Sequence, residues 1–312
     1  MKYAVKKIAV LIFTLILVSI ITFIAFNILP GDYATTSLGV NASPEEIDEY
    51  NAKLGLDRPA TERYFSWIGN LLKGDLGTSF STGRGVGTEI IQSFPATLVL
   101  TFFSLFIILI FSVLLGIFSA KHEHSFLDNS IMTSSFVVMS IPNFFIGLVA
   151  SWFFGVTLGW FSPSNYIGYD ENFIGFLQYL ILPAFAIALP KIGMTAKFMR
   201  TSVIEQKNAG YVRTAKGIGL KPNEIMYKHI LKNAFLPVVT FLGIITTELI
   251  AGSVIIEQIF QIRGIGRLLL NALSKRDIPL AQGTVLFIAF MVILINFAVD
   301  MIYKSLDPRV RT

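Results

Sequence analysis

Residues Lys191 to Pro237 read KIGMTAKFMRTSVIEQKNAGYVRTAKGIGLKPNEIMYKHILKNAFLP, a long basic segment between segments apolar enough to lie in lipid. Nine Lys and Arg residues lie in it, against two acids, Glu205 and Glu224. Loops on the cytoplasmic side of a membrane protein carry an excess of Lys and Arg. This segment is therefore expected to face the cytoplasm, and the rest of the fold is arranged around it.

The interior of this segment predicts a short amphipathic helix. Tyr211, Ala215 and Ile218 recur at the spacing of one apolar helix face, whereas Arg213 and Lys216 point elsewhere. A small amphipathic helix on a basic cytoplasmic loop is expected to contact a partner protein.

A second short helix is predicted directly after it. Gly219 is placed as the residue that follows the end of the first helix. Pro222 suits the first turn of the next helix, in which Glu224 and Lys228 form a favourable i, i+4 pair.

Composition excludes a soluble globular domain. Of 312 residues, 54% are hydrophobic and 14% are charged, and the mean hydropathy is +0.67. The net charge of +5 comes from the loops assigned to the cytoplasm, so it does not indicate nucleic-acid binding. The chain has no cysteine, which excludes a disulfide framework, a thiolate metal site and a thiol nucleophile.

Six apolar segments are long enough to cross the bilayer as helices. They are expected at about 8–30, 90–120, 129–160, 173–196, 233–256 and 278–299. The third is expected to be one long span that Pro142 can kink. The distribution of cations places both termini in the cytoplasm, so the sequence predicts an all-α integral membrane protein.

The polar segment between the first two spans is expected to lie outside, because its acids outnumber its bases. Ser43, Pro44 and Glu46 fit the N-cap, first position and capping-box acid of a short helix, and Gly55 fits its stop. The segment is either a connecting loop or a surface that receives substrate.

Two acids are candidates for a translocation pathway. Glu248 lies at membrane depth in the fifth span, where a carboxylate must face a partner helix or a wet cavity. A packing role and a pathway role both remain open. Asp277, just before the last span, is the second candidate.

Eight further stretches, in order along nearly the whole chain, carry a resemblance together with the basic segment. They are ILPGD (28–32), LGLDRP (54–59), KGDLGTS (73–79), FPATLVLT (94–101), SIPNFF (140–145), GSVIIEQIFQIRGIGRLL (252–269), KRDIPLAQG (275–283) and VDMIYKSLDPRVR (299–311). With Arg200 and residues 208–237, they resemble the B-type permease subunits of the ABC importers for dipeptides, oligopeptides and nickel.

The resemblance implies a type I ABC importer permease fold. The expected parts are an anchor helix (1–30), an extracytoplasmic segment (31–94), a transmembrane domain (95–304) and a cytoplasmic tail (305–312). Within the domain, the coupling loop covers about 200–233. The implied contacts to an ATPase are Tyr211, Arg213, Thr214, Ala215, Lys216, Ile218 and Gly219. Arg213 departs from other importer families, which keep a glutamate there.

The resemblance also implies a non-catalytic translocation subunit in the cytoplasmic membrane, surrounded by lipid. Its expected partners are a second homologous permease, an extracytoplasmic binding protein and two ATPase subunits, which bind ATP and Mg²⁺. No cofactor, metal or nucleic acid is expected on this chain. The expected substrates are peptides, with nickel or a metal chelate as the alternative.

Two other classes of function are less consistent with the residues. A self-sufficient secondary transporter or channel predicts paired intramembrane charges or two similar halves, and the sequence shows one acid and no obvious repeat. An intramembrane enzyme needs a cluster of polar catalytic residues within the spans, which is not seen. The sequence also lacks a phosphate-binding loop of the Walker type.

Overall fold

A computed structural model describes residues 2–28, 33–39, 42–162 and 165–306. These residues are predominantly helical, and one isolated backbone bridge among them joins Thr78 and Gly85. The expected boundary at residue 30 and most of the expected tail at 305–312 lie outside the described residues. The chain divides into two compact units, Met1–Thr97 with Ile262–Ile293, and Leu98–Gln261 with Leu294–Thr312.

The first unit contains the N-terminal helices and the region before the last span. Its helices are α1 (Lys2–Ile28), α2 (Tyr33–Leu38), α3 (Pro44–Lys53), α4 (Ala60–Leu71), α13 (Ile265–Ser274) and the first parts of α5 (Val86–Lys121) and α14 (Ile278–Leu306). Val86, Ile90, Ile265 and Leu280 form its buried core with their neighbours. The core thus joins the start of α5 to α13 and α14.

The predicted capping box of α3 is confirmed. Ser43 Oγ accepts a hydrogen bond from the Glu46 N–H at 3.3 Å, and the Ser43 N–H donates to Glu46 Oε2 at 2.8 Å. Gly55, just past the helix end, has φ of +68°, which favours glycine.

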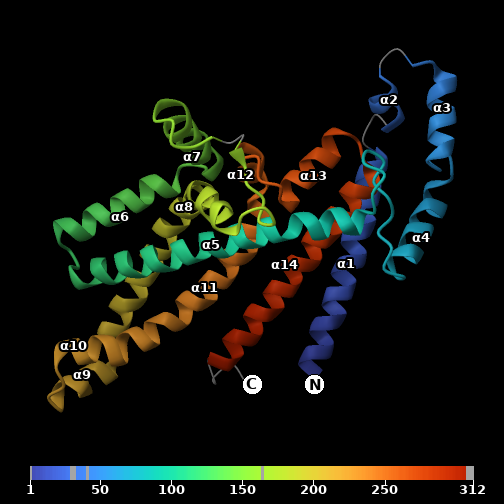
Figure 1. Cartoon of the computed structure of the whole chain (residues 1–312). Coiled ribbons are helices and arrows are strands. Elements are labelled where there is room, and N and C mark those ends of the chain that lie inside the picture. The colour runs from blue at the N-terminus through green and yellow to red at the C-terminus, as the bar shows by residue number, and fades with distance from the viewer. Residues whose placement is uncertain (1, 29–32, 40–41, 163–164, 307–312) are drawn as a thin grey trace. The chain divides into compact units, whose positions relative to one another are not determined.

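The second unit is built around α8 (Phe173–Lys207), which packs against α6 (Phe126–Met139), α7 (Asn143–Ala150) and α11 (Leu231–Gly252). Its other elements are η1 (Ser151–Thr157), α9 (Gly210–Gly217), α10 (Pro222–Glu224), η3 (Ile225–Ile230) and α12 (Val254–Ile259). Figure 1 shows α9 and α10 at the far end of α11, where the chain returns from α8.

Small residues allow the helices of the second unit to pack closely. A Cβ on Gly116 of α5 would lie 2.7 Å from Met199 Cβ of α8. A Cβ on Gly193 of α8 would lie 3.0 Å from the Ser135 carbonyl oxygen of α6. Such contacts between small residues are typical of helices that associate in lipid, where burial of apolar surface gives no driving force.

Within the residues that the structure describes, five helical segments are long and apolar enough to cross a membrane, or six if one bent pair counts as a single span. The five are Ala9–Ile28, Val86–Lys121, Phe173–Lys207, Pro222–Ala251 and Ile278–Met301. The sides of the membrane, and the position of the extracytoplasmic segment, remain predictions.

The third predicted span is bent sharply at Pro142, where the sequence predicts a kink, and its count as a single span stays a prediction. Residues 126–139 and 143–157 form two helical segments that meet at 93°. The break includes Ile141 and Pro142. Proline has no N–H for a helical bond, and it disfavours the helical conformation in the residue before it. Pro142 therefore begins a new helix, whereas the sequence predicts only a kink in an existing one.

The helix of the fourth predicted span is longer than the span itself. The sequence predicts an end at about residue 196, but α8 continues as one helix to Lys207. The beginning of the basic segment, from Lys191, is therefore part of a membrane-length helix.

Candidate functional site

The interior of the basic segment forms the short helix α9 and a glycine turn, as predicted, but the second predicted short helix is the beginning of the continuous helical segment Pro222–Ala251. α9 ends where the Ile218 N–H donates to the Thr214 carbonyl at 3.1 Å and the Gly219 N–H donates to the Lys216 carbonyl at 3.0 Å. Gly219 has φ of +83°. A side chain would meet no atom within 4 Å there, so the backbone conformation, and not the available space, requires glycine.

The second helix begins as predicted, with Pro222 in its first turn. The predicted ion pair is present, with a separation of 2.7 Å between Lys228 Nζ and Glu224 Oε1. The helical path then continues through η3 into α11.

The inner face of α9 packs against its own chain. Val212 and Ala215 are buried and join a core that includes Met199 of α8 and Ile225 and Ile230 of η3. The prediction that Ala215 contacts an ATPase groove therefore needs correction, because only 7% of its surface is exposed. Val212, which the helical pattern did not single out, shares this buried face.

The outer face of this region is exposed and basic. We name it the outer edge of α9; its residues are Arg213, Thr214, Lys216, Gly217, Ile218 and Gly219. Ile218 is 72% exposed, so it does not share an apolar face with Ala215 as predicted. Tyr211 is half-buried, and its hydroxyl bonds to Gln206 Oε1 at 2.9 Å.

A buried ion pair holds the turn between α5 and α6 against α8. Arg200 donates from Nε to Asp128 Oδ1 and from Nη2 to Asp128 Oδ2, both at 2.6 Å. Asp128 is 1% exposed, and it also accepts from Ser119 Oγ and from the His124 N–H. The sequence singled out Arg200 but gave no signal for Asp128, which lies 72 residues away.

Lys207 and Lys121 add contacts between this turn and the basic segment. Lys207 Nζ lies 3.1 Å from the Ala120 carbonyl and 3.2 Å from Glu123 Oε2. Lys121 Nζ donates to the Tyr227 hydroxyl of η3 at 2.8 Å. Together with the core around Ala215, these bonds tie α9 to the ends of α5 and α8.

Glu248, the first pathway candidate, faces a partner helix. It forms an ion pair with Lys191 of α8. The sequence assigned Lys191 to the cytoplasmic loop and showed a single acid within the spans, whereas the structure pairs this acid with Lys191. The contact joins residues 57 positions apart and depends on how α8 and α11 align.

Asp277, the second candidate, is fully buried. It accepts hydrogen bonds from Ser79 Oγ at 2.6 Å, from the Ser81 N–H at 2.9 Å and from the Phe80 N–H at 3.1 Å. It also caps α14, through the Leu280 N–H at 3.3 Å. This geometry supports a structural role, and the pathway role stays a prediction.

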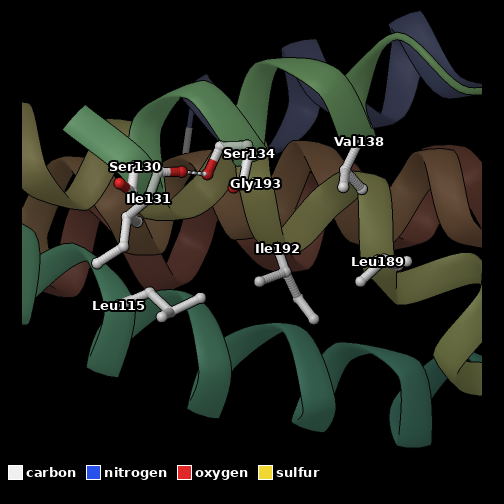
Figure 2. Close-up of a pocket in the computed structure, with 9 residues that line it drawn as sticks. Leu115, Ser130, Ile131, Ser134, Val138, Leu189, Ile192 and Gly193 are labelled. Atoms are coloured by element: carbon white, nitrogen blue, oxygen red, sulfur yellow. Dashed lines mark hydrogen bonds between the residues drawn. The ribbon is translucent and has the colours of Figure 1, made fainter. Parts of the chain in front are cut away.

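A cavity of about 310 Å³ lies between α5, α6 and α8. Figure 2 shows Leu115 of α5, Ser130 and Ser134 of α6 and Ile192 of α8 at its wall. The lining has no charged side chain. Within the described residues, no group of three or more metal-ligating His, Cys, Asp or Glu side chains is found.

Two family models together cover most of the chain. Residues 112–312 match the family described as binding-protein-dependent transport system inner membrane component. Residues 1–101 match the N-terminal region of the membrane component of such systems.

Full-length relatives agree with this match. The chain is 33% identical over 311 residues to the oligopeptide transport system permease protein AppB of Bacillus subtilis, covering 99% of this chain and 98% of the relative. It is 34% identical over 332 residues to the di/tripeptide transport system permease protein DppB of Pseudomonas aeruginosa, covering 100% and 99%. A third relative, the dipeptide transport system permease protein DppB of Alkalihalophilus pseudofirmus, is 34% identical over 329 residues, with 99% of each chain covered.

Proposed function

Because the chain belongs to the family of binding-protein-dependent transport system inner membrane components, we propose that it is the permease subunit of an ATP-driven importer for peptides. The proposal that the substrates are peptides rests on the full-length similarity to permeases named for oligopeptide, di/tripeptide and dipeptide transport. These relatives give no support to the nickel alternative.

The outer edge of α9 is proposed as the surface that docks on an ATPase subunit. Ile218 is an exposed apolar side chain beside Arg213 and Lys216. Protein interfaces combine buried apolar contacts with a polar rim, and this edge offers one apolar and two basic side chains. An apolar pocket with acidic residues around it would complement this edge.

The packing of α9 supports a role in transmitting force. Its buried face is joined to α8, α5 and η3 through the core around Ala215. The Arg200–Asp128 pair fixes α8 to the neighbouring turn. A movement of the ATPase against the outer edge would thus reach membrane-length helices through packed side chains.

The proposed transporter contains this chain, a second homologous permease, two ATPase subunits that bind ATP and Mg²⁺, and an extracytoplasmic binding protein. Both termini lie in the cytoplasm. Peptides pass between the two permeases by alternating access, and this chain carries out no chemical step.

Uptake by the complete transporter in lipid vesicles tests this function. A radiolabelled tripeptide should accumulate only when ATP, the ATPase subunits and the loaded binding protein are all present. Accumulation of a nickel chelate but not of peptide would favour the nickel alternative. Uptake by this chain without the ATPase subunits would instead indicate a secondary transporter.

A further inference from the structure

Two opposite charges meet between α8 and α11, inside segments that are apolar and long enough to cross a membrane. Lys191 Nζ of α8 contacts Glu248 Oε2 of α11. The side chains nevertheless stay 27% and 50% exposed. Lys191 and Glu248 are therefore in contact, and part of each side chain remains accessible.

Glu248 lies on the uncovered stripe of α11. Pro237, Ile244, Glu248 and Ala251 are all exposed, and spacings of seven, four and three residues place them along one helix face. A carboxylate exposed to hydrocarbon is costly, and in membrane proteins such groups face a water-filled cavity or another protein. In the assembled transporter, this stripe is therefore not a lipid-facing surface.

The pair differs from the structural ion pair in the same unit. Asp128 is 1% exposed and receives two bonds from Arg200 as well as bonds from Ser119 and His124. Within the described residues, Glu248 accepts a hydrogen bond from Lys191 alone. One of its carboxylate oxygens thus remains open to a further donor.

We propose that Lys191 and Glu248 form a binding site for the charged end groups of a peptide in the translocation pathway. The peptide's α-ammonium group pairs with Glu248, and its α-carboxylate pairs with Lys191. This inference rests on the proposed function. It assigns to the permease itself a contact with its substrate.

The exchange of partners keeps the site electrically neutral. Without peptide, the two side chains neutralise each other, which lowers the cost of keeping each charge in a low-dielectric region. A zwitterionic peptide brings one ammonium and one carboxylate, so the internal pair is replaced by two charge-assisted pairs. End groups are common to all unmodified peptides, so such a site does not depend on side-chain sequence.

Cysteine protection tests the proposal, because the native chain has no cysteine. Ile244→Cys places a thiol at a 52% exposed position one turn before Glu248. In the purified nucleotide-free complex, a charged water-soluble thiol reagent should modify this cysteine. Trialanine at about ten times its Kd should slow the modification about tenfold, in proportion to site occupancy.

Charge removal should abolish the protection. In the Ile244→Cys background, Glu248→Gln and Lys191→Met should each leave the thiol reactive but remove the effect of trialanine. Trialanine with an acetylated N-terminus and an amidated C-terminus should not protect the original variant. Glu49→Gln, which removes a carboxylate paired with Lys53 outside the spans, is the matched control and should leave protection intact. Ile245→Cys, at a buried neighbouring position, should stay unmodified.

Three results would overturn the proposal: no modification of Ile244→Cys, modification without protection by trialanine, or equal protection by the capped peptide. Measuring peptide uptake by the same preparation distinguishes a failure of this inference from a failure of the proposed function. If uptake is normal and protection is absent, the end-group site is wrong and the transport function stands.

Discussion

Gly219 shows how one backbone conformation fixes the outer edge of α9. Its φ of +83° lies in the left-handed region, where a residue with a Cβ costs on the order of 1 kcal/mol and a β-branched residue costs more. Gly219→Val should therefore redirect the chain after α9. We expect normal membrane insertion, because no span is altered, and loss of both transport and substrate-stimulated ATP hydrolysis by the complex.

Gly210→Ala is the matched control, because Gly210 begins α9 outside its outer edge and without a positive φ, and an added Cβ would meet no atom within 4 Å. It should retain both activities. Equal activity of Gly219→Val and Gly210→Ala in a reconstituted complex would refute this role for the turn.

A carboxylate introduced at Ala215 should lower the stability of the chain, whereas one introduced at Ile218 should weaken ATPase binding. Ala215→Glu places a carboxylate in the core of the second unit, where overpacking alone costs about 1–3 kcal/mol and burial of an unpaired charge adds to that cost. Ile218→Glu changes an exposed side chain. In SDS titrations of the purified chain, Ala215→Glu should unfold at a lower SDS fraction, whereas Ile218→Glu should match the native protein but bind the ATPase weakly. The reverse ranking would contradict the assignment of the two faces.

The helical period placed Ala215 correctly on an apolar face but did not place Ile218 correctly, and Gly219 follows the helix end as predicted. The conformation of Gly219 follows from local chain geometry. Ile218, however, lies just beyond the last residue of α9, so the turn and not the helix sets its direction. The Lys191–Glu248 pair was not predictable either, because it depends on the alignment of two helices distant in sequence.

At the scale of elements, the Arg200–Asp128 pair is expected to hold α8 against the α5–α6 turn. Arg200→Met removes one partner of a pair in which Asp128 is almost fully buried. Breaking such a pair typically costs about 3–5 kcal/mol. We expect a clearly lower unfolding midpoint in SDS titration.

Lys228→Met is the control for this prediction. It also breaks an ion pair, with Glu224, but Lys228 is 71% exposed. Exposed i, i+4 pairs contribute about 0.3–0.5 kcal/mol, so the midpoint should hardly change. Similar effects of the two variants would mean that the Arg200–Asp128 pair does not stabilise the unit.

The membrane-length helices could be predicted from the length of their apolar segments, and α3 and α10 could be predicted from local signals at their ends. Ser43 and Glu46 cap α3, and Pro222 begins α10. The 93° break after α6 could not be predicted in the same way, because the stretch that contains it has the length and apolar character of one span. A proline removes one helical bond, but the resulting angle is set by packing against α8, which the local sequence does not encode.

For the whole molecule, single cysteines test the predicted sides of the membrane. We expect an impermeant thiol reagent to label intact cells at Ser43→Cys and not at Ser125→Cys, Thr214→Cys or Thr312→Cys. The reason is the excess of cations in the segments assigned to the cytoplasm. Labelling of Thr214→Cys from outside would invert the topology.

The central claim is that the outer edge of α9 docks on an ATPase subunit, and crosslinking tests it most directly. A short thiol-to-amine reagent should join Ile218→Cys to the ATPase in the assembled complex, because Ile218 is 72% exposed. Val212→Cys, at a position that is 2% exposed on the inner face, should give no crosslink. Neither variant should crosslink to the extracytoplasmic binding protein. If cysteines at 213, 214, 216, 217, 218 and 219 all fail to reach the ATPase in a complex that transports peptide, the outer edge of α9 is not the coupling surface.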